Sequence, residues 1–193
     1  NNMDAYDWFV QGRTLYNTTT PDDNIRACSM FEKATTLDPK FAAAYALLAQ
    51  TYLRDWVTFW EYLPETSYQR AWEYARISVE LDDTDSVTHS SLGFVNLFNG
   101  NHDQAFYHLN RALELNPGDI DALIFISRCE MLSGNPERAI ERINEANRYN
   151  PFGKYNWSLV PAYYAMQRYD EAKSVMSAIQ NPASLMIIWM AAV

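Results

Sequence analysis

The sequence predicts an all-α solenoid built from pairs of antiparallel helices, and a repeat period is the first reason. Residues 100–105 (Gly-Asn-His-Asp-Gln-Ala) recur 34 positions later as residues 134–139 (Gly-Asn-Pro-Glu-Arg-Ala). Residues 111–117 recur at the same spacing as residues 145–151, and both copies end in Asn-Pro. A fixed period of this length is typical of repeat proteins whose neighbouring units stack to bury one continuous core.

Landmark residues inside each period are the second reason. One alanine recurs at intervals of 34, 34 and 33 residues from Ala71 onward, and an earlier member, Ala27, precedes Ala71 by 44 residues. The second repeat therefore carries an insertion of ten residues. First helices also carry a small residue where two helix backbones must approach closely. These small residues are Gly12, Ala49, Gly93 and Ser127.

The boundaries follow from these landmarks and from Asp-Pro and Asn-Pro pairs, because proline cannot continue the hydrogen bonds of a helix that has just ended. We expect eleven helices, which form five pairs and a solitary last helix. The expected first helices are 4–17, 41–56, 85–99, 119–133, 154–167 and 183–193. Their expected partners are 22–37, 65–81, 102–115, 136–149 and 169–180.

This period, with Leu-Gly, Ala and Pro landmarks, is similar to that of tetratricopeptide repeat proteins. The resemblance implies one right-handed superhelical domain over residues 1–193. Its expected repeats are 4–40, 41–84, 85–118, 119–152 and 153–182, followed by a partial repeat at 183–193. Because the chain stops within that partial repeat, we expect it to be a fragment of a longer protein.

Composition and charge limit the partners. The chain has 193 residues, 48% of them hydrophobic, and a net charge of −9. Nucleic acids and anionic membranes both require dense positive charge, so neither is an expected partner. Cys28 and Cys129 lie in different repeats without metal-ligand spacing, which favours buried thiols in a reducing cytoplasm over a disulfide.

The expected binding surface is the inner face of the superhelix, where first-helix residues opposite the core stripe would form a groove. Aromatic rings there offer contact area and arginines offer directed charge, which suits a protein or peptide partner. The alternative is that these residues pack against a neighbouring repeat. The candidates are Tyr6, Phe9, Arg13, Tyr16, Arg54, Phe94, Phe98 and Arg128, with Asp121 and Trp157 on the same face.

The ten-residue insertion forms a second candidate surface. Trp56, Phe59 and Trp60 cluster where ordinary repeats have a tight turn. Clustered aromatic residues either extend the core locally or, when exposed, mark an interface, here for a second copy of the chain.

Patterns for catalysis and for metal or cofactor binding are not found. His89, His102 and His108 are spaced unsuitably for joint metal ligation. Residues 82–85 (Asp-Asp-Thr-Asp) lack the glycine and the final glutamate of a calcium loop and read as a solvated turn with an N-cap. We therefore expect a chain that is not an enzyme.

Several segments resemble the tetratricopeptide tail of bacterial class III adenylate/guanylate cyclases. They are residues 4–13, 31–34, 37–45, 71–75, 81–85 and 148–152, together with the aromatic insertion. The resemblance implies a cytoplasmic regulatory or scaffolding region attached to an enzyme, and no catalytic residue carries over. Related tails occur in bacterial transcriptional regulators, so a scaffold that binds a peptide or a second copy stays open. A sensor that encloses a small ligand near Phe94 and Phe98 is a third reading.

One family-specific site is not expected. Tetratricopeptide domains that hold the C-terminal carboxylate of a chaperone use a Lys/Asn clamp on their inner helices. The matching positions here are Phe9, Arg13, Val87 and Ser91, which cannot form that clamp.

Overall fold

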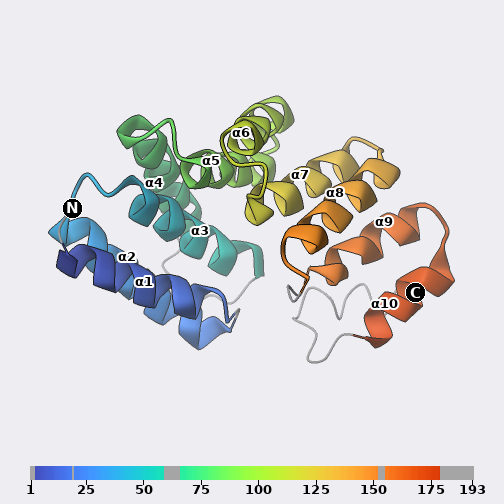
Figure 1. Cartoon of the computed structure of the whole chain (residues 1–193), viewed down its shortest axis with the longest axis horizontal. Helices are drawn as coiled ribbons and strands as arrows, with labels where there is room; N and C mark the ends of the chain where they lie inside the picture. The colour runs from blue at the N-terminus through green and yellow to red at the C-terminus, as the bar shows by residue number, and fades with distance from the viewer. Residues whose placement is uncertain (1–2, 19, 59–65, 152–154, 179–193) are drawn as a thin grey trace.

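The computed structural model of the chain describes residues 3–18, 20–58, 66–151 and 155–178 (Figure 1). All regular elements within these ranges are helices, as the repeat period predicts. They are α1 (Met3–Tyr16), α2 (Pro21–Leu37), α3 (Ala42–Thr58), α4 (Ser67–Leu81), α5 (Ser86–Phe98), α6 (His102–Leu115), α7 (Ile120–Leu132), α8 (Pro136–Tyr149), the 3₁₀ turn η1 (Asn156–Ser158), α9 (Leu159–Ala165) and α10 (Tyr169–Ser177).

Local sequence explains where several helices begin. The side chain of Asp85 accepts a hydrogen bond from the backbone N–H of Val87, and Asp119 does the same for Ala122. Such caps satisfy N–H groups that have no partner inside the helix. Residues 82–85 are therefore a turn that ends in an N-cap, as expected.

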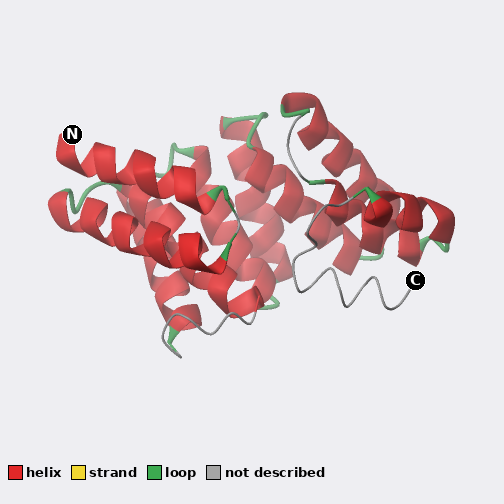
Figure 2. Ribbon diagram, turned by 90° about the horizontal axis from the view of Figure 1, so that it is seen from below, coloured by secondary structure: helices red, strands yellow, loops and turns green. Residues whose placement is uncertain are grey.

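Successive helices form antiparallel pairs, and the pairs follow one another along an arch (Figures 1 and 2). Each helix packs against the next one in the chain, while α1 contacts α3, α3 contacts α5 and α5 contacts α7. Helices α1, α3, α5 and α7 therefore form one continuous layer, which we call the inner layer, and their partners form a second layer beside it.

Two glycines allow the helices of a pair to approach closely. A Cβ atom added at Gly93 would lie 2.6 Å from Cγ of Leu109, and one added at Gly12 would lie 2.8 Å from the ring of Phe31. Both distances are shorter than normal contacts between carbon atoms. The expectation of small residues where backbones approach is confirmed at these two positions.

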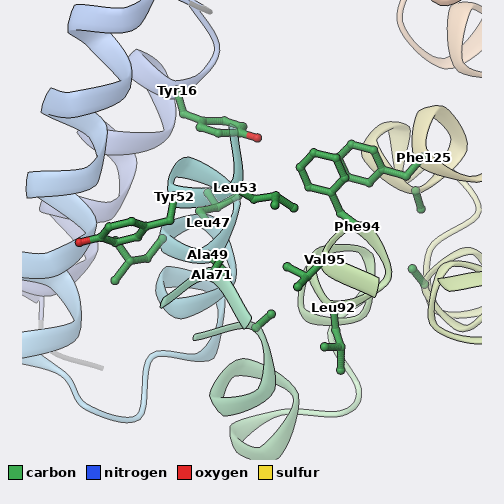
Figure 3. Packing of buried hydrophobic residues seen from close by; sticks show 14 of the residues in the cluster. Tyr16, Leu47, Ala49, Tyr52, Leu53, Ala71, Leu92, Phe94, Val95 and Phe125 are labelled. Carbon is green, nitrogen blue, oxygen red and sulfur yellow. The ribbon is translucent and has the colours of Figure 1, made fainter. Parts of the chain in front are cut away.

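The core runs through the array without a break from α1 to α7 (Figure 3). Cys28 and Cys129 are both buried in it as free thiols, and burial raises the pKa of each to about 12. Neither thiol is therefore a reactive thiolate at neutral pH.

The fifth pair differs from expectation. A first helix was expected over 154–167, but the structure has the short η1 turn followed by α9, which ends at Ala165. Gln167 lies just beyond with φ of 60°, a left-handed conformation that stops the helix. The expected last helix, 183–193, lies outside the described residues.

Candidate functional site

The structure brings six residues into two groups of contacts that share helix α7, and we call these six residues the inner row. Two of them come from the first two repeats and the others from α5, α7 and η1. The inner row consists of Tyr16, Arg54, Phe98, Asp121, Arg128 and Trp157.

Tyr16 and Arg54 form the first part of the row. The guanidinium carbon of Arg54 lies 3.4 Å from the centre of the Tyr16 ring, and its Nη1 donates to the Tyr16 carbonyl at 2.6 Å. The Tyr16 hydroxyl donates to Oε1 of Gln50 at 2.9 Å. Burial raises the pKa of Tyr16 to about 12, so this hydroxyl stays protonated. The contacts fix α1 against α3.

Asp121 begins the α7 part of the row. Burial raises the pKa of its carboxyl to about 6, and the nearby charge of Asp119 adds to this increase, whereas Arg54 opposes it. Arg54 therefore acts on Asp121 from a different repeat, and Asp121 titrates close to neutral pH.

An aromatic stack supports the middle of the row. The rings of Phe94 and Phe125 are parallel within 5° with centres 3.9 Å apart, and Phe98 meets Phe94 edge-on at 5.2 Å. Figure 3 shows the ring of Tyr16 pointing towards the Phe94 and Phe125 pair, with Leu53 beside it. Stacked rings at these distances stabilise a contact beyond the area they bury.

Arg128 lies between two aromatic rings farther along the row. Its guanidinium carbon is 5.8 Å from the centre of the Phe98 ring and 5.0 Å from that of Trp157. Burial lowers the pKa of Arg128 to about 10, so the side chain remains charged at neutral pH. Within the described residues it has neither a hydrogen-bond acceptor nor a carboxylate partner.

Three predicted groove residues turn out to be core residues. Phe9 is only 6% exposed because its ring packs against Phe31 and Phe41, with centres 5.9 Å and 4.8 Å away. Phe94 is 5% exposed because Phe125 covers it, and Tyr16 is 5% exposed beneath Arg54. The expectation that these three rings present open surface is wrong. The alternative, packing against a neighbouring element, holds for all three.

The other α1 candidates lie at the surface. Tyr6 is 48% exposed, and Arg13 is exposed with its guanidinium carbon 5.5 Å from the centre of the Phe9 ring. Neither takes part in the contacts of the inner row.

The insertion candidates are only partly covered by the structure. Trp56 belongs to the end of α3, is 45% exposed and packs against the ring of Tyr68 at 5.2 Å. Phe59 and Trp60 lie outside the described residues.

A histidine pair was missed by the sequence reasoning. Nδ1 of His89 on α5 lies 3.0 Å from Nδ1 of His108 on α6, and Nε2 of His89 lies 3.0 Å from the carbonyl oxygen of Asp83. Because a carbonyl only accepts, His89 donates from Nε2 and accepts at Nδ1 from His108. A clue lay in the sequence, because His89 and His108 lie at comparable distances from the turn that joins the antiparallel helices α5 and α6.

Two other kinds of site are not found in the described part of the chain. No three His, Cys, Asp or Glu side chains there are grouped so that they could hold a metal ion. No helix there is long and apolar enough to cross a membrane.

Comparison with known proteins identifies the repeat. The model of the tetratricopeptide repeat family matches residues 98–160. The chain is 26% identical over 143 residues to the TPR repeat-containing protein YpiA of Bacillus subtilis (strain 168), a match that covers 74% of this chain and 31% of YpiA. The chain spans less than a third of the length of the curated relatives it matches.

Solved structures share the fold. The crystal structure of TTC0263, a thermophilic TPR protein of Thermus thermophilus, matches with a TM-score of 0.72 at 20% identity, covering 97% of this chain and 98% of that one. YrrB, described as a TPR protein with an unusual peptide-binding site, matches with a TM-score of 0.54 at 19% identity, covering 100% and 94%. The chain thus shares the superhelical fold of these solved tetratricopeptide repeat proteins, and the family's sequence pattern matches residues 98–160.

Proposed function

We propose that this chain is a protein-interaction module that binds an extended segment of a partner protein along the inner row. The observation that carries the proposal is the alternation of aromatic rings and arginines across successive repeats, with Arg54 on Tyr16 and Arg128 between Phe98 and Trp157. Rings and arginines are the residue types that contribute most to binding at protein interfaces.

The inner row brings side chains from distant repeats close together. Arg54 of α3 covers the ring of Tyr16 of α1, and its charge acts on Asp121 of α7. A partner segment that contacts the row therefore meets several repeats at once. The peptide-binding site named for YrrB supports the same kind of ligand.

Selection from a random-peptide display library tests the proposal. We expect peptides that bind the chain, and we expect Phe98→Ala to weaken them at least tenfold while circular dichroism shows an unchanged fold. Tyr107→Ala is the matched control, because Tyr107 is 61% exposed on α6, outside the inner layer. If the affinity of the peptides is unchanged by Phe98→Ala but reduced by Tyr107→Ala, the binding site lies elsewhere.

The finer proposal concerns the protein to which this module belongs. On its resemblance to cyclase tails, we propose that the module acts in the cytoplasm as the regulatory region of a bacterial class III adenylate/guanylate cyclase. The complete reading frame tests this: a cyclase catalytic domain before Asn1 supports it, and a different enzyme or a regulator domain there refutes it.

Self-association is a second candidate, favoured by the exposed Trp56 at the base of the insertion. Light scattering on the chain and on a deletion of residues 56–60 tests it. Loss of a dimer with retained helicity supports the candidate, whereas a monomer in both samples excludes it. The sensor reading lacks such support, since the Phe125 ring already occupies the space beside Phe94.

A further inference from the structure

Arg128 brings a positive charge into the inner row without a counter-charge. Its guanidinium is flanked by Phe98 of α5 and Trp157 of η1, and burial alone lowers its pKa. In the part of the chain that the structure describes, none of its N–H groups donates a hydrogen bond to a protein acceptor. The Arg128 side chain is partly exposed, so its N–H groups are open to solvent or to a ligand.

The carboxylates nearest in sequence are engaged elsewhere. Glu130 is buried and accepts a hydrogen bond from Nδ2 of Asn135 at 3.2 Å. Asp121 stands two helical turns before Arg128, about 10 Å along the axis, and responds to Arg54 and Asp119. The only side-chain carboxylates of the sequence outside the described ranges are Glu61 and Glu65.

The ring contacts of Arg128 indicate which chemical group would bind it. A guanidinium is planar, and its five N–H bonds lie in that plane, whereas aromatic rings are drawn to its faces. Rings on Phe98 and Trp157 therefore leave the edge of Arg128 as its hydrogen-bonding side. A carboxylate matches two of these N–H groups at once, which a single hydroxyl or amide oxygen does not.

We infer that Arg128 receives a carboxylate of the partner segment, an inference that rests on the proposed binding along the inner row. The carboxylate is either an Asp or Glu side chain or the C-terminal carboxyl group of the partner. The arginine edge and the two rings together recognise it, with the rings excluding water from the pair.

Binding measurements on the display-selected peptides test this inference. Fluorescence polarisation compares each peptide with two altered forms: one in which the critical Glu or Asp is replaced by its amide, and one with an amidated C-terminus. We expect one of the two changes to weaken binding at least tenfold. Which of them does so shows whether the carboxylate comes from a side chain or from the C-terminus. Arg128→Gln weakens binding equally, and in that variant neither peptide change has a further effect. Arg138→Gln, on an exposed arginine of α8, leaves binding unchanged.

Thermal unfolding of the free chain gives an independent readout. If Arg128 awaits a ligand, Arg128→Met melts within about 5 °C of the parent, because loss of the two ring contacts and removal of an unpaired charge have opposite effects. A larger fall would show instead that Arg128 supports the fold. The double variant Glu61→Gln/Glu65→Gln tests for a counter-ion within the chain. If these substitutions lower the melting temperature by the same amount in the parent but not in Arg128→Met, one of the two carboxylates pairs with Arg128. That result would also overturn the inference.

The two proposals fail separately. Peptides that depend on Phe98 but bind Arg128→Gln normally, or show no preference for carboxylates, overturn the role of Arg128 alone. A library that yields no peptide dependent on Phe98 overturns the proposed function, and the role of Arg128 with it.

Discussion

Arg54 covers the ring of Tyr16 from the next repeat, with its guanidinium carbon 3.4 Å from the ring centre and Nη1 2.6 Å from the Tyr16 carbonyl oxygen. The end of α1 is thus held by a side chain located 38 residues farther along the sequence. This contact joins the first repeat to the second, and at the same time it places a charge in the inner row beside Asp121.

Replacing Arg54 by Met therefore destabilises the array. Loss of the ring contact and of a charged hydrogen bond lowers the free energy of unfolding by about 2 kcal/mol. Urea denaturation measures it, with Arg76→Met as the control, because Arg76 makes only an exposed pair with Glu80 on the same helix and such pairs contribute less than about 0.5 kcal/mol. Equal effects of the two substitutions would contradict the structure.

The histidine pair makes stability depend on pH. Burial and the neighbouring His89 lower the pKa of His108 from its ordinary value of 6.5 to about 4. The unfolded chain therefore binds the proton more readily than the folded one, and stability falls as pH drops from about 7 towards 4. Because His108 is only half-buried, we expect a loss of about 1–2 kcal/mol from this group.

Chemical denaturation at a series of pH values isolates the effect. The Asp83 carbonyl contacts His89 and the ring of Tyr107 meets His108 edge-on at 5.0 Å. His108→Gln should flatten the pH dependence between 7 and 4 relative to the parent. His102→Gln, at an exposed position, should keep it. An identical pH profile for all three proteins argues against the pair.

Gly93 is predicted to tolerate no larger residue. In Gly93→Ala the new Cβ would lie 2.6 Å from Cγ of Leu109, so α5 and α6 must separate, at a cost of about 1–3 kcal/mol. Thermal unfolding checks this. The double variant Gly93→Ala/Leu109→Ala should lose less than the sum of the two single losses, because the shortened side chain removes the clash. Strict additivity would mean that the two residues do not meet.

Gln167 offers a stabilising substitution. Gly100 and Gly134 end α5 and α7 with φ of 75° and 78°, and Gln167 adopts 60° at the matching point after α9. A side chain in this left-handed region costs about 1–2 kcal/mol, partly offset by the greater freedom of glycine in the unfolded chain. Gln167→Gly should therefore raise the free energy of unfolding by about 0.5–1 kcal/mol. Differential scanning calorimetry checks this, and Gln167→Ala, which keeps the strain, should show no gain.

The helices could be predicted from sequence because each repeat carries its own boundaries. The expected partner helices 102–115 and 136–149 match the structure at both ends. Their landmarks are local: a turn with glycine before the helix and Asn-Pro after it. The bounds of the fifth first helix were predicted less accurately, because Gln167 stands where the earlier repeats have glycine. A glutamine does not indicate a left-handed backbone conformation.

The site was only partly predictable. A helical stripe argument treats one helix at a time, so it assigns each residue to a face without showing what packs against that face. It could not tell that Phe94 would be covered, since that depends on how closely α7 approaches α5. The histidine pair was not predicted for the same reason: contacts between helices depend on the relative height and crossing angle of the helices.

The face-to-face stack of Phe94 and Phe125 has a mechanical consequence. Bending the array tighter or flatter changes the separation of α5 and α7, and two rings already 3.9 Å apart resist both compression and parting. The stack consequently holds the curvature of the array between α5 and α7, so a change of shape there would have to break the contact between the two rings.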